Sequence, residues 1–268
     1  MGGLMSERSG VVQIGLEGFM LVGAFAAAAL AALGVPPMVA FGLGGVSGAL
    51  LASLYSWISV NLKGNQIVAG MGVNLLAIGL TPLLCKAFYG TSTSTPQLTF
   101  DQRLMDSPYV IVVLACAFVW VLVMVLRGGL WIRFAGEHPV ALQAAGVSPK
   151  RVRLMSVMFG GFLAGMGGAV LSVCLASSFA RNMTSGRGFI ALVALILGRW
   201  RPIPTVLSCL LFGLLEVAQI RLQGVVLWGS EPVAVQFIQI LPYVATLVVL
   251  SRFSGISHAP KALGLPLE

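Results

Sequence analysis

Long apolar stretches recur along the whole chain and are separated by short runs that contain Gly, Pro or charged residues. Eight stretches can be distinguished: Val11–Leu33, Pro37–Val60, Gln66–Leu84, Tyr109–Leu126, Leu154–Ala176, Gly188–Gly198, Ile203–Ile220 and Val235–Leu250. An α-helix rises about 1.5 Å per residue, so most of them are long enough to cross a hydrocarbon core of roughly 30 Å. The pattern predicts an all-α, polytopic transmembrane helix bundle that occupies residues 1–268 as one domain.

The sixth stretch, Gly188–Gly198, is too short for that role. Its length covers about half of a bilayer core. We therefore expect either a helix extended by Arg187 and its neighbours or a half-helix that is buried in the bundle.

The composition excludes a soluble fold. The chain is 58% hydrophobic and 9% charged, whereas soluble domains carry about a quarter charged residues. Its net charge of +8 does not indicate nucleic-acid binding, because the basic residues gather in short loops, as membrane orientation requires. The histidines and cysteines stand in no HExxH or CxxC pattern, so no metal site is predicted.

Charge sets the expected orientation. The segment Arg127–Arg153 contains Arg127, Arg133, Lys150, Arg151 and Arg153 against the single acid Glu137. Short loops rich in Lys and Arg remain on the cytoplasmic side, so this loop should be cytoplasmic and both termini should lie on the same side.

The same loop contains the signals of a short helix. Pro139 suits the first helical turn and Gly146 suits the C-terminal stop, which predicts a helix over Pro139–Ala145. Ser148 then begins the next membrane helix. The residues alone leave two interpretations open: the helix docks onto another protein, or it lies on anionic lipid headgroups.

Small residues at helical spacing indicate close helix packing. They are Gly44, Gly48, Ala52 and Ser56 in the second stretch, and the pairs Gly161/Gly165 and Ala164/Gly168 in the fifth. They predict a multi-helix bundle and carry no information about a substrate.

A weak internal repeat links residues 16–24 with residues 186–194. The block that begins Leu16-Glu-Gly-Phe aligns with Gly186-Arg-Gly-Phe, and a proline break follows each block, at Pro36 and at Pro202. In the expected topology the two blocks run in opposite directions. This arrangement is typical of inverted repeats that flank a transport pathway, although chance similarity is the alternative.

Polar residues within the apolar stretches are candidates for a translocation pathway. Gln66, Gly70 and Asn74 share one helix face, and amides can bond the hydroxyls of a polar solute or the backbone of another helix. Glu17 and Glu216 are acids in apolar surroundings, where ionisation costs roughly 2.5–3.5 kcal/mol. Each should face a cavity, pair with a base or be protonated.

The chain contains no GxxxxGK[ST] phosphate loop and no GxSxG elbow, so no enzymatic activity is expected and any ATP must be hydrolysed by a partner.

Four motifs in order carry a family resemblance: Ser6–Gly18, Gly64–Gly70 with Asn74, Gly136–Gly146 and Gly186–Ala194. Across nearly the whole chain, the sequence resembles bacterial ABC-type permeases of the nucleoside and simple-sugar branch, related to the ribose and branched-chain amino acid permeases. Two features depart from the family. Members usually carry a further membrane helix before the first motif, and Gln13 stands where Asn is typical.

The resemblance implies a membrane-spanning importer subunit of the bacterial inner membrane. Its coupling helix, which seats on an ATP-binding cassette ATPase, would include Glu137, His138, Pro139, Ala141, Ala144, Ala145 and Gly146. The implied partners are that ATPase, which uses ATP and Mg, a second identical or paralogous permease subunit, an external solute-binding protein and lipid. A nucleoside or simple sugar is the implied solute. A secondary transporter or channel for a small polar solute is the alternative function.

Overall fold

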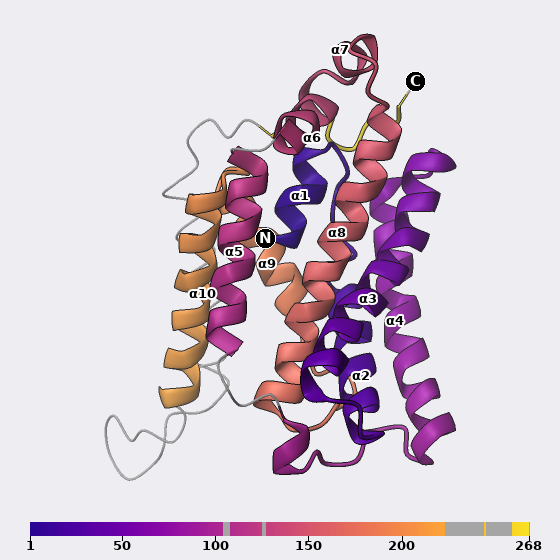
Figure 1. Cartoon of the computed structure of the whole chain (residues 1–268), viewed down its shortest axis with the longest axis vertical. Helices are drawn as coiled ribbons and strands as arrows, with labels where there is room; N and C mark the ends of the chain where they lie inside the picture. Colours follow the sequence, from indigo (N-terminus) through magenta and orange to yellow (C-terminus); the bar gives the residue numbers. More distant parts are fainter. Residues whose placement is uncertain (104–107, 125–126, 223–243, 245–258, 268) are drawn as a thin grey trace. The chain divides into compact units, whose positions relative to one another are not determined.

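A computed structural model describes the chain apart from residues 104–107, 125–126, 223–243, 245–258 and 268. The described residues form helices and their connections, with one isolated bridge between Ser94 and Ala180. The helices of Figure 1 are α1 (Gly2–Arg8), α2 (Leu16–Ala32), α3 (Pro37–Ser56), α4 (Gln66–Tyr89), α5 (Pro108–Met124), α6 (Arg127–Glu137), α7 (Pro139–Ala144), α8 (Pro149–Ala169), α9 (Arg187–Leu197) and α10 (Pro202–Leu222).

The predicted helical membrane bundle is confirmed. Among the described residues, four helical stretches are long and apolar enough to span a bilayer: Pro37–Asn61, Gln66–Tyr89, Pro149–Leu175 and Pro202–Leu222. Two of them end in π-helical turns, Trp57–Asn61 and Val170–Leu175. The shorter apolar helices include α2 and α9, and α9 matches the half-length stretch that the sequence predicts. The predicted stretch Val235–Leu250 lies outside the described residues, except for Val244.

The structure differs from the sequence prediction at two places. Residues 11–15 of the first apolar stretch are not helical, and α2 begins only at Leu16. Residues 127–137 form α6, although their charge predicts a loop. The buried residues Gly129, Ile132 and Ala135 recur every three positions in α6, so one face of this helix packs on the protein.

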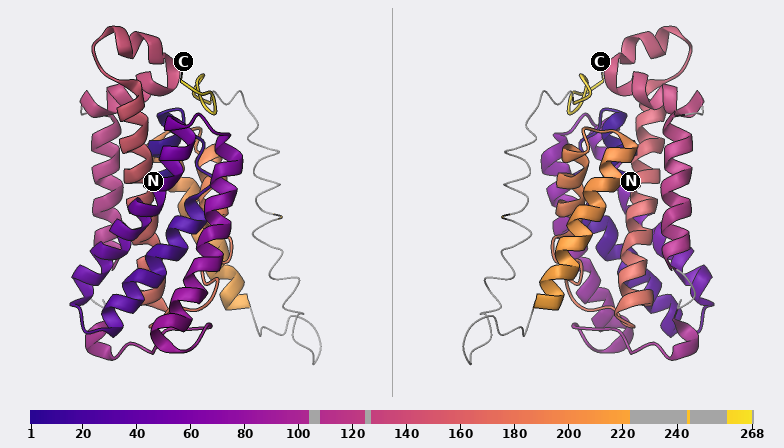
Figure 2. Two further views of the ribbon diagram at one scale, coloured as in Figure 1. Left: turned by 90° about the vertical axis from the view of Figure 1, so that its right-hand side faces the viewer. Right: turned by 90° about the vertical axis from the view of Figure 1, so that its left-hand side faces the viewer.

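Two compact units divide the chain: Met1–Leu192 with Pro260–Glu268, and Val193–Ala259. In the first unit, Gly2 lies against Gly160, about three turns into α8. The C-terminal segment, which begins at Pro260, lies beside α6. It is at the end of the first unit that carries α7, as both views of Figure 2 show. The orientation of the two chain ends relative to a membrane stays a prediction.

Glycines allow α2, α3 and α8 to meet at Gly165 in the first unit. A Cβ atom on Gly23 would lie 2.4 Å from the Gly165 Cα, and one on Gly48 would lie 2.8 Å from the same atom. Real Cβ contacts are never this short, so any larger residue would push the helices apart. The close packing predicted for Gly48 and Gly165 is confirmed.

The described part of the second unit contains a tight turn before α10. Arg199 and Trp200 have φ values of +52° and +53°, and a Cβ on Gly198 would lie 2.5 Å from the Thr205 backbone nitrogen. The end of α9 and the start of α10 are therefore in direct backbone contact.

Adjacent glycines in α8 provide a matched test of this packing. A Cβ on Gly168 would lie 1.8 Å from the Met20 carbonyl oxygen, whereas one on Gly167 would meet only the Met20 Cε at 4.0 Å. We expect Gly168→Ala to destabilise the protein by about 1–3 kcal/mol, because α2 and α8 must separate. Thermal unfolding in detergent measures this change. Gly167→Ala is the control and should unfold at or above the wild-type temperature; equal midpoints for the two variants would contradict the packing.

Candidate functional site

The short helix α7 projects from one end of the first unit (Figure 1). Pro139 occupies its first turn, Ala145 is its C-cap, and Gly146 follows with a φ of +81°. The left-handed conformation at that position ends the helix, as the sequence predicts. Leu142 is the buried residue of α7, whereas Val140 is 77% exposed. One side of α7 therefore holds it to the protein and the other is available to a partner.

The residues expected to contact an ATPase lie along this projection. Glu137 is the last residue of α6 and His138 the N-cap of α7. Pro139 is half-buried, and the exposed members of the set are Glu137, His138, Ala141, Ala144, Ala145 and Gly146. Their exposure leaves them free for contact, and their role in coupling stays a prediction.

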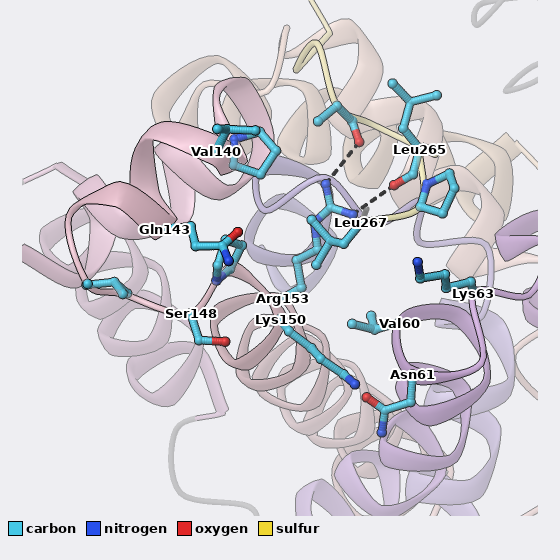
Figure 3. A pocket seen from close by; sticks show the side chains of 16 residues that line it. Val60, Asn61, Lys63, Val140, Gln143, Ser148, Lys150, Arg153, Leu265 and Leu267 are labelled. Atoms are coloured by element: carbon cyan, nitrogen blue, oxygen red, sulfur yellow. Dashed lines mark hydrogen bonds between the residues drawn. The ribbon is translucent and has the colours of Figure 1, made fainter.

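Arg153, in the first turns of α8, holds the base of this projection together. Arg153 is 2% exposed, and its guanidinium donates to backbone carbonyl oxygens of four residues. Figure 3 shows the bonds to Ala262 and Leu265. These are Ser9 at 3.0 Å, Ala135 at 3.3 Å, Ala262 at 3.3 Å and Leu265 at 2.8 Å. Planar guanidinium groups suit such multiple bonds, since several N–H groups diverge from one rigid plane. One side chain thus joins the end of α1, the end of α6 and the C-terminal segment.

Backbone contacts complete this junction. The Ala262 N–H donates to the Gly136 carbonyl at 2.8 Å, and the Gly264 N–H donates to the Gly10 carbonyl at 3.2 Å. A Cβ on Gly136 would lie 2.2 Å from the Arg8 carbonyl oxygen. No larger residue fits there without a shift, so the end of α6 is in direct contact with the end of α1.

Two of the predicted pathway residues, Gln66 and Asn74, bind the non-helical segment that precedes α2 and the first turn of α2 itself. Gln66 Oε1 accepts from the Val12 N–H at 2.8 Å. Asn74 Oδ1 accepts from the Gly18 N–H at 2.8 Å, and its Nδ2 donates to the Ile14 carbonyl at 2.9 Å. The segment lacks helical hydrogen bonds of its own, so the amides of α4 supply partners for its backbone.

Glu17 plays the corresponding role for α9. Glu17 is 3% exposed, and its two carboxylate oxygens accept from the N–H groups of Gly186 at 2.8 Å and Gly188 at 2.7 Å. These are donors that a helix leaves unsatisfied at its N-terminus, where the helix dipole also favours negative charge. A Cβ on Gly188 would lie 2.5 Å from the Glu17 backbone nitrogen, so the two segments touch.

The two blocks of the internal repeat are therefore in contact with each other. The Leu16 block is capped by Asn74, and its own Glu17 caps the Gly186 block. Gln66, Asn74 and Glu17 gather around α2 and the segment before it, whereas Glu216 is half-buried on α10 in the second unit. All four residues remain pathway candidates.

Sequence reasoning missed the role of Arg153, which it counted as a loop cation. Nothing in the local pattern distinguishes Arg153 from the exposed Arg151, because its partners are carbonyls up to 144 positions away. The surroundings of Gln13 could not be predicted from the sequence either. This residue, in the segment that joins α1 to α2, is fully buried, and neither Nε2 nor Oε1 of its side chain has a hydrogen-bond partner.

Within the described residues, no group of three or more His, Cys, Asp or Glu side chains is placed to hold a metal ion.

Interrupted helices whose free backbone groups are bound by buried side chains are typical of solute-translocating membrane proteins, and their combination with apolar spans indicates a permease. The chain belongs to the family described as the branched-chain amino acid transport system / permease component, which matches residues 1–250.

Relatives support the same membership. A nucleoside ABC transporter permease protein of Lactococcus lactis is 33% identical, over 99% of this chain and 90% of its own. A guanosine ABC transporter permease protein of Bacillus subtilis is 32% identical with the same coverage. A putative glucose ABC transporter permease protein of Haloferax volcanii is 32% identical over 94% of this chain and 85% of its own. No solved structure matches the chain.

The cap on α9 can be tested with Glu17→Gln. The variant loses the negative charge and one of the two acceptors, and hydrogen bonds to charged groups contribute about 1.5–3 kcal/mol. We expect the amides of Gly186 and Gly188 to exchange hydrogen faster, on the order of tenfold, as measured by mass spectrometry. Asp101→Asn, at an exposed acid, is the control and should leave exchange in this segment unchanged. Unchanged exchange in Glu17→Gln would rule out the cap.

Arg153→Met tests the junction under α7. Losing the guanidinium removes its bonds to Ala262 and Leu265, so the C-terminal segment should detach more often. Trypsin then cleaves after the exposed Lys261 faster, on the order of tenfold, because hydrogen bonds from a charged donor are worth about 1.5–3 kcal/mol. Mass spectrometry of the released peptide gives the rate. Arg151→Met serves as the control, and equal cleavage of both variants would show that Arg153 does not hold the segment.

Proposed function

We propose that the chain is the membrane-spanning permease subunit of an ATP-driven importer in the bacterial inner membrane, and that it passes a nucleoside or a simple sugar. The names of the relatives from Lactococcus and Bacillus support a nucleoside, and that of the Haloferax relative supports a sugar. Residues 1–268 would act together as one permease domain.

The mounting of α7 is the observation on which this proposal rests. The exposed helix is joined through a rigid junction to α8, which packs on α2 and α3 through glycines. A push on α7 would therefore reach the membrane helices directly and would not be absorbed by a flexible loop. In the proposal, α7 and the C-terminal segment face the cytoplasm, and the residues from Glu137 to Gly146 contact the ATPase.

The need for a separate ATPase follows from the absence of a phosphate loop in the sequence, and the other two partners are inferred from the family resemblance. A separate ATPase subunit would bind ATP and Mg and hydrolyse the nucleotide. A second permease subunit would complete the membrane part, and an external binding protein would deliver the solute. This chain itself would carry no cofactor and no enzymatic activity.

The solute pathway is proposed to run beside the interrupted helices. Gln66, Asn74 and Glu17 hold the places where α2 and α9 begin, and such interruptions commonly mark the binding site of a transporter. Glu216 is the proposed contribution of α10. The amide and carboxylate groups would act by keeping the backbone beside the pathway in place.

Photo-crosslinking at α7 tests the proposal. A photoreactive amino acid placed at His138 or Ala144, both exposed, should capture the co-expressed ATPase subunit in native membranes, and mass spectrometry identifies the product. The control position is Thr93, which is exposed and follows the opposite end of α4 from Gln66. It should capture no ATPase.

Two results would contradict the assignment. One is capture of the ATPase from Thr93 and not from His138 or Ala144. The other is solute uptake by the purified chain alone in liposomes under an ion gradient, which would favour a secondary transporter or channel.

A further inference from the structure

A cleft of about 830 Å³ lies beside α7 at the same end of the first unit. Three segments form its walls: α7 with the start of α8, the end of the α3 span from Val60 to Lys63, and the C-terminal segment near Leu265. Figure 3 shows Lys150 reaching toward Asn61, whereas Lys63 reaches into the cleft from the opposite wall. The volume is large enough for several side chains of a partner.

One wall of the cleft belongs to α7 itself. Pro139, Val140 and Gln143 line the cleft, and Val140 is also 77% exposed at the surface of α7. A protein that seats on the exposed side of α7 therefore also covers the cleft. A lipid headgroup would have to share the same wall with that protein, so the geometry favours a protein segment as occupant.

The lining is positively charged. Lys63 and Lys150 are exposed cations, and the cleft-lining residues that the structure describes include no Asp or Glu. Ser148 and the amides of Asn61 and Gln143 add hydrogen-bond donors. Arg153 lies beneath them with its N–H groups on backbone carbonyls, and it adds charge to the floor. Such a lining attracts carboxylates and disfavours a basic or purely apolar segment.

The shape of the cleft does not depend on a partner. Its C-terminal wall is tied down by the bond from Arg153 to the Leu265 carbonyl and by the bond from the Ala262 N–H to the Gly136 carbonyl. A preformed cleft binds more tightly than one that must be ordered first, because the ordering entropy has already been lost in folding.

We propose that this cleft receives an acidic segment of the ATPase subunit, whose Asp or Glu side chains pair with Lys63 and Lys150. The inference rests on the proposed function, since it assumes that an ATPase docks at α7. It extends that function in two ways. It adds a second contact with the ATPase, formed by the end of the α3 span and the C-terminal segment, and it specifies that the ATPase segment is acidic.

The test measures binding of the purified ATPase to the permease in lipid nanodiscs at several salt concentrations. The double variant Lys63→Gln/Lys150→Gln should bind more weakly, on the order of tenfold at low salt, and its affinity should depend less on salt. Lys63→Arg/Lys150→Arg keeps both charges and should retain the wild-type affinity. Arg151→Gln removes an exposed cation that does not line the cleft, so it should change neither quantity.

A photoreactive amino acid at Asn61 identifies the occupant. Captured ATPase peptides should contain Asp or Glu at the crosslinked site, and a captured segment without acids would overturn the proposal.

The proposal also fails if the glutamine double variant binds the ATPase like wild type while a photoreactive residue at position 138 still captures the ATPase; the proposed function then stands. A loss of anionic-lipid binding without a loss of ATPase binding would make the cleft a lipid site. Failure of the His138 crosslink itself would count against the proposed function.

Discussion

Backbone N–H and C=O groups inside a membrane must find partners within the protein, and this requirement governs the interrupted helices of the chain. An uninterrupted helix satisfies its own groups, but the segment before α2 and the start of α9 cannot. Gln66, Asn74 and Glu17 supply the missing partners at 2.7–2.9 Å. The polar residues that stand out in an apolar sequence are thus the ones that make non-helical backbone tolerable at these points.

The sequence was most informative where the physical rule is local. Apolar length predicts the spans, and proline and glycine signals predict α7 to within one residue at its C-terminal end. Predictions failed where a distant partner decides the conformation. Residues 11–15 are apolar enough for a helix, yet they are non-helical because α4 amides bind their backbone. The basic residues of 127–137 led us to predict a loop there. The spacing of the residues that are buried in α6 would have predicted a helix.

In the candidate site, too, residues governed by local sequence could be predicted, and residues governed by distant partners could not. The exposed residues of the α7 region could be named from one short motif, because they need no partner within the chain. The junction beneath them could not, since Arg153 contacts backbone atoms of three separate segments and any residue type supplies a carbonyl. For the same reason the sequence could not predict the cleft: Lys63 and Lys150 are far apart along the chain and come to line one cleft only through the fold.

The first turn of α2 links three helices. Its Gly18 N–H is held from α4, while the neighbouring side chain of Glu17 holds the start of α9. Twisting α2 about its axis would break both attachments at once, so these helices resist sliding past one another. A movement that separates the first turn of α2 from α4 or from the start of α9 must therefore break these buried hydrogen bonds.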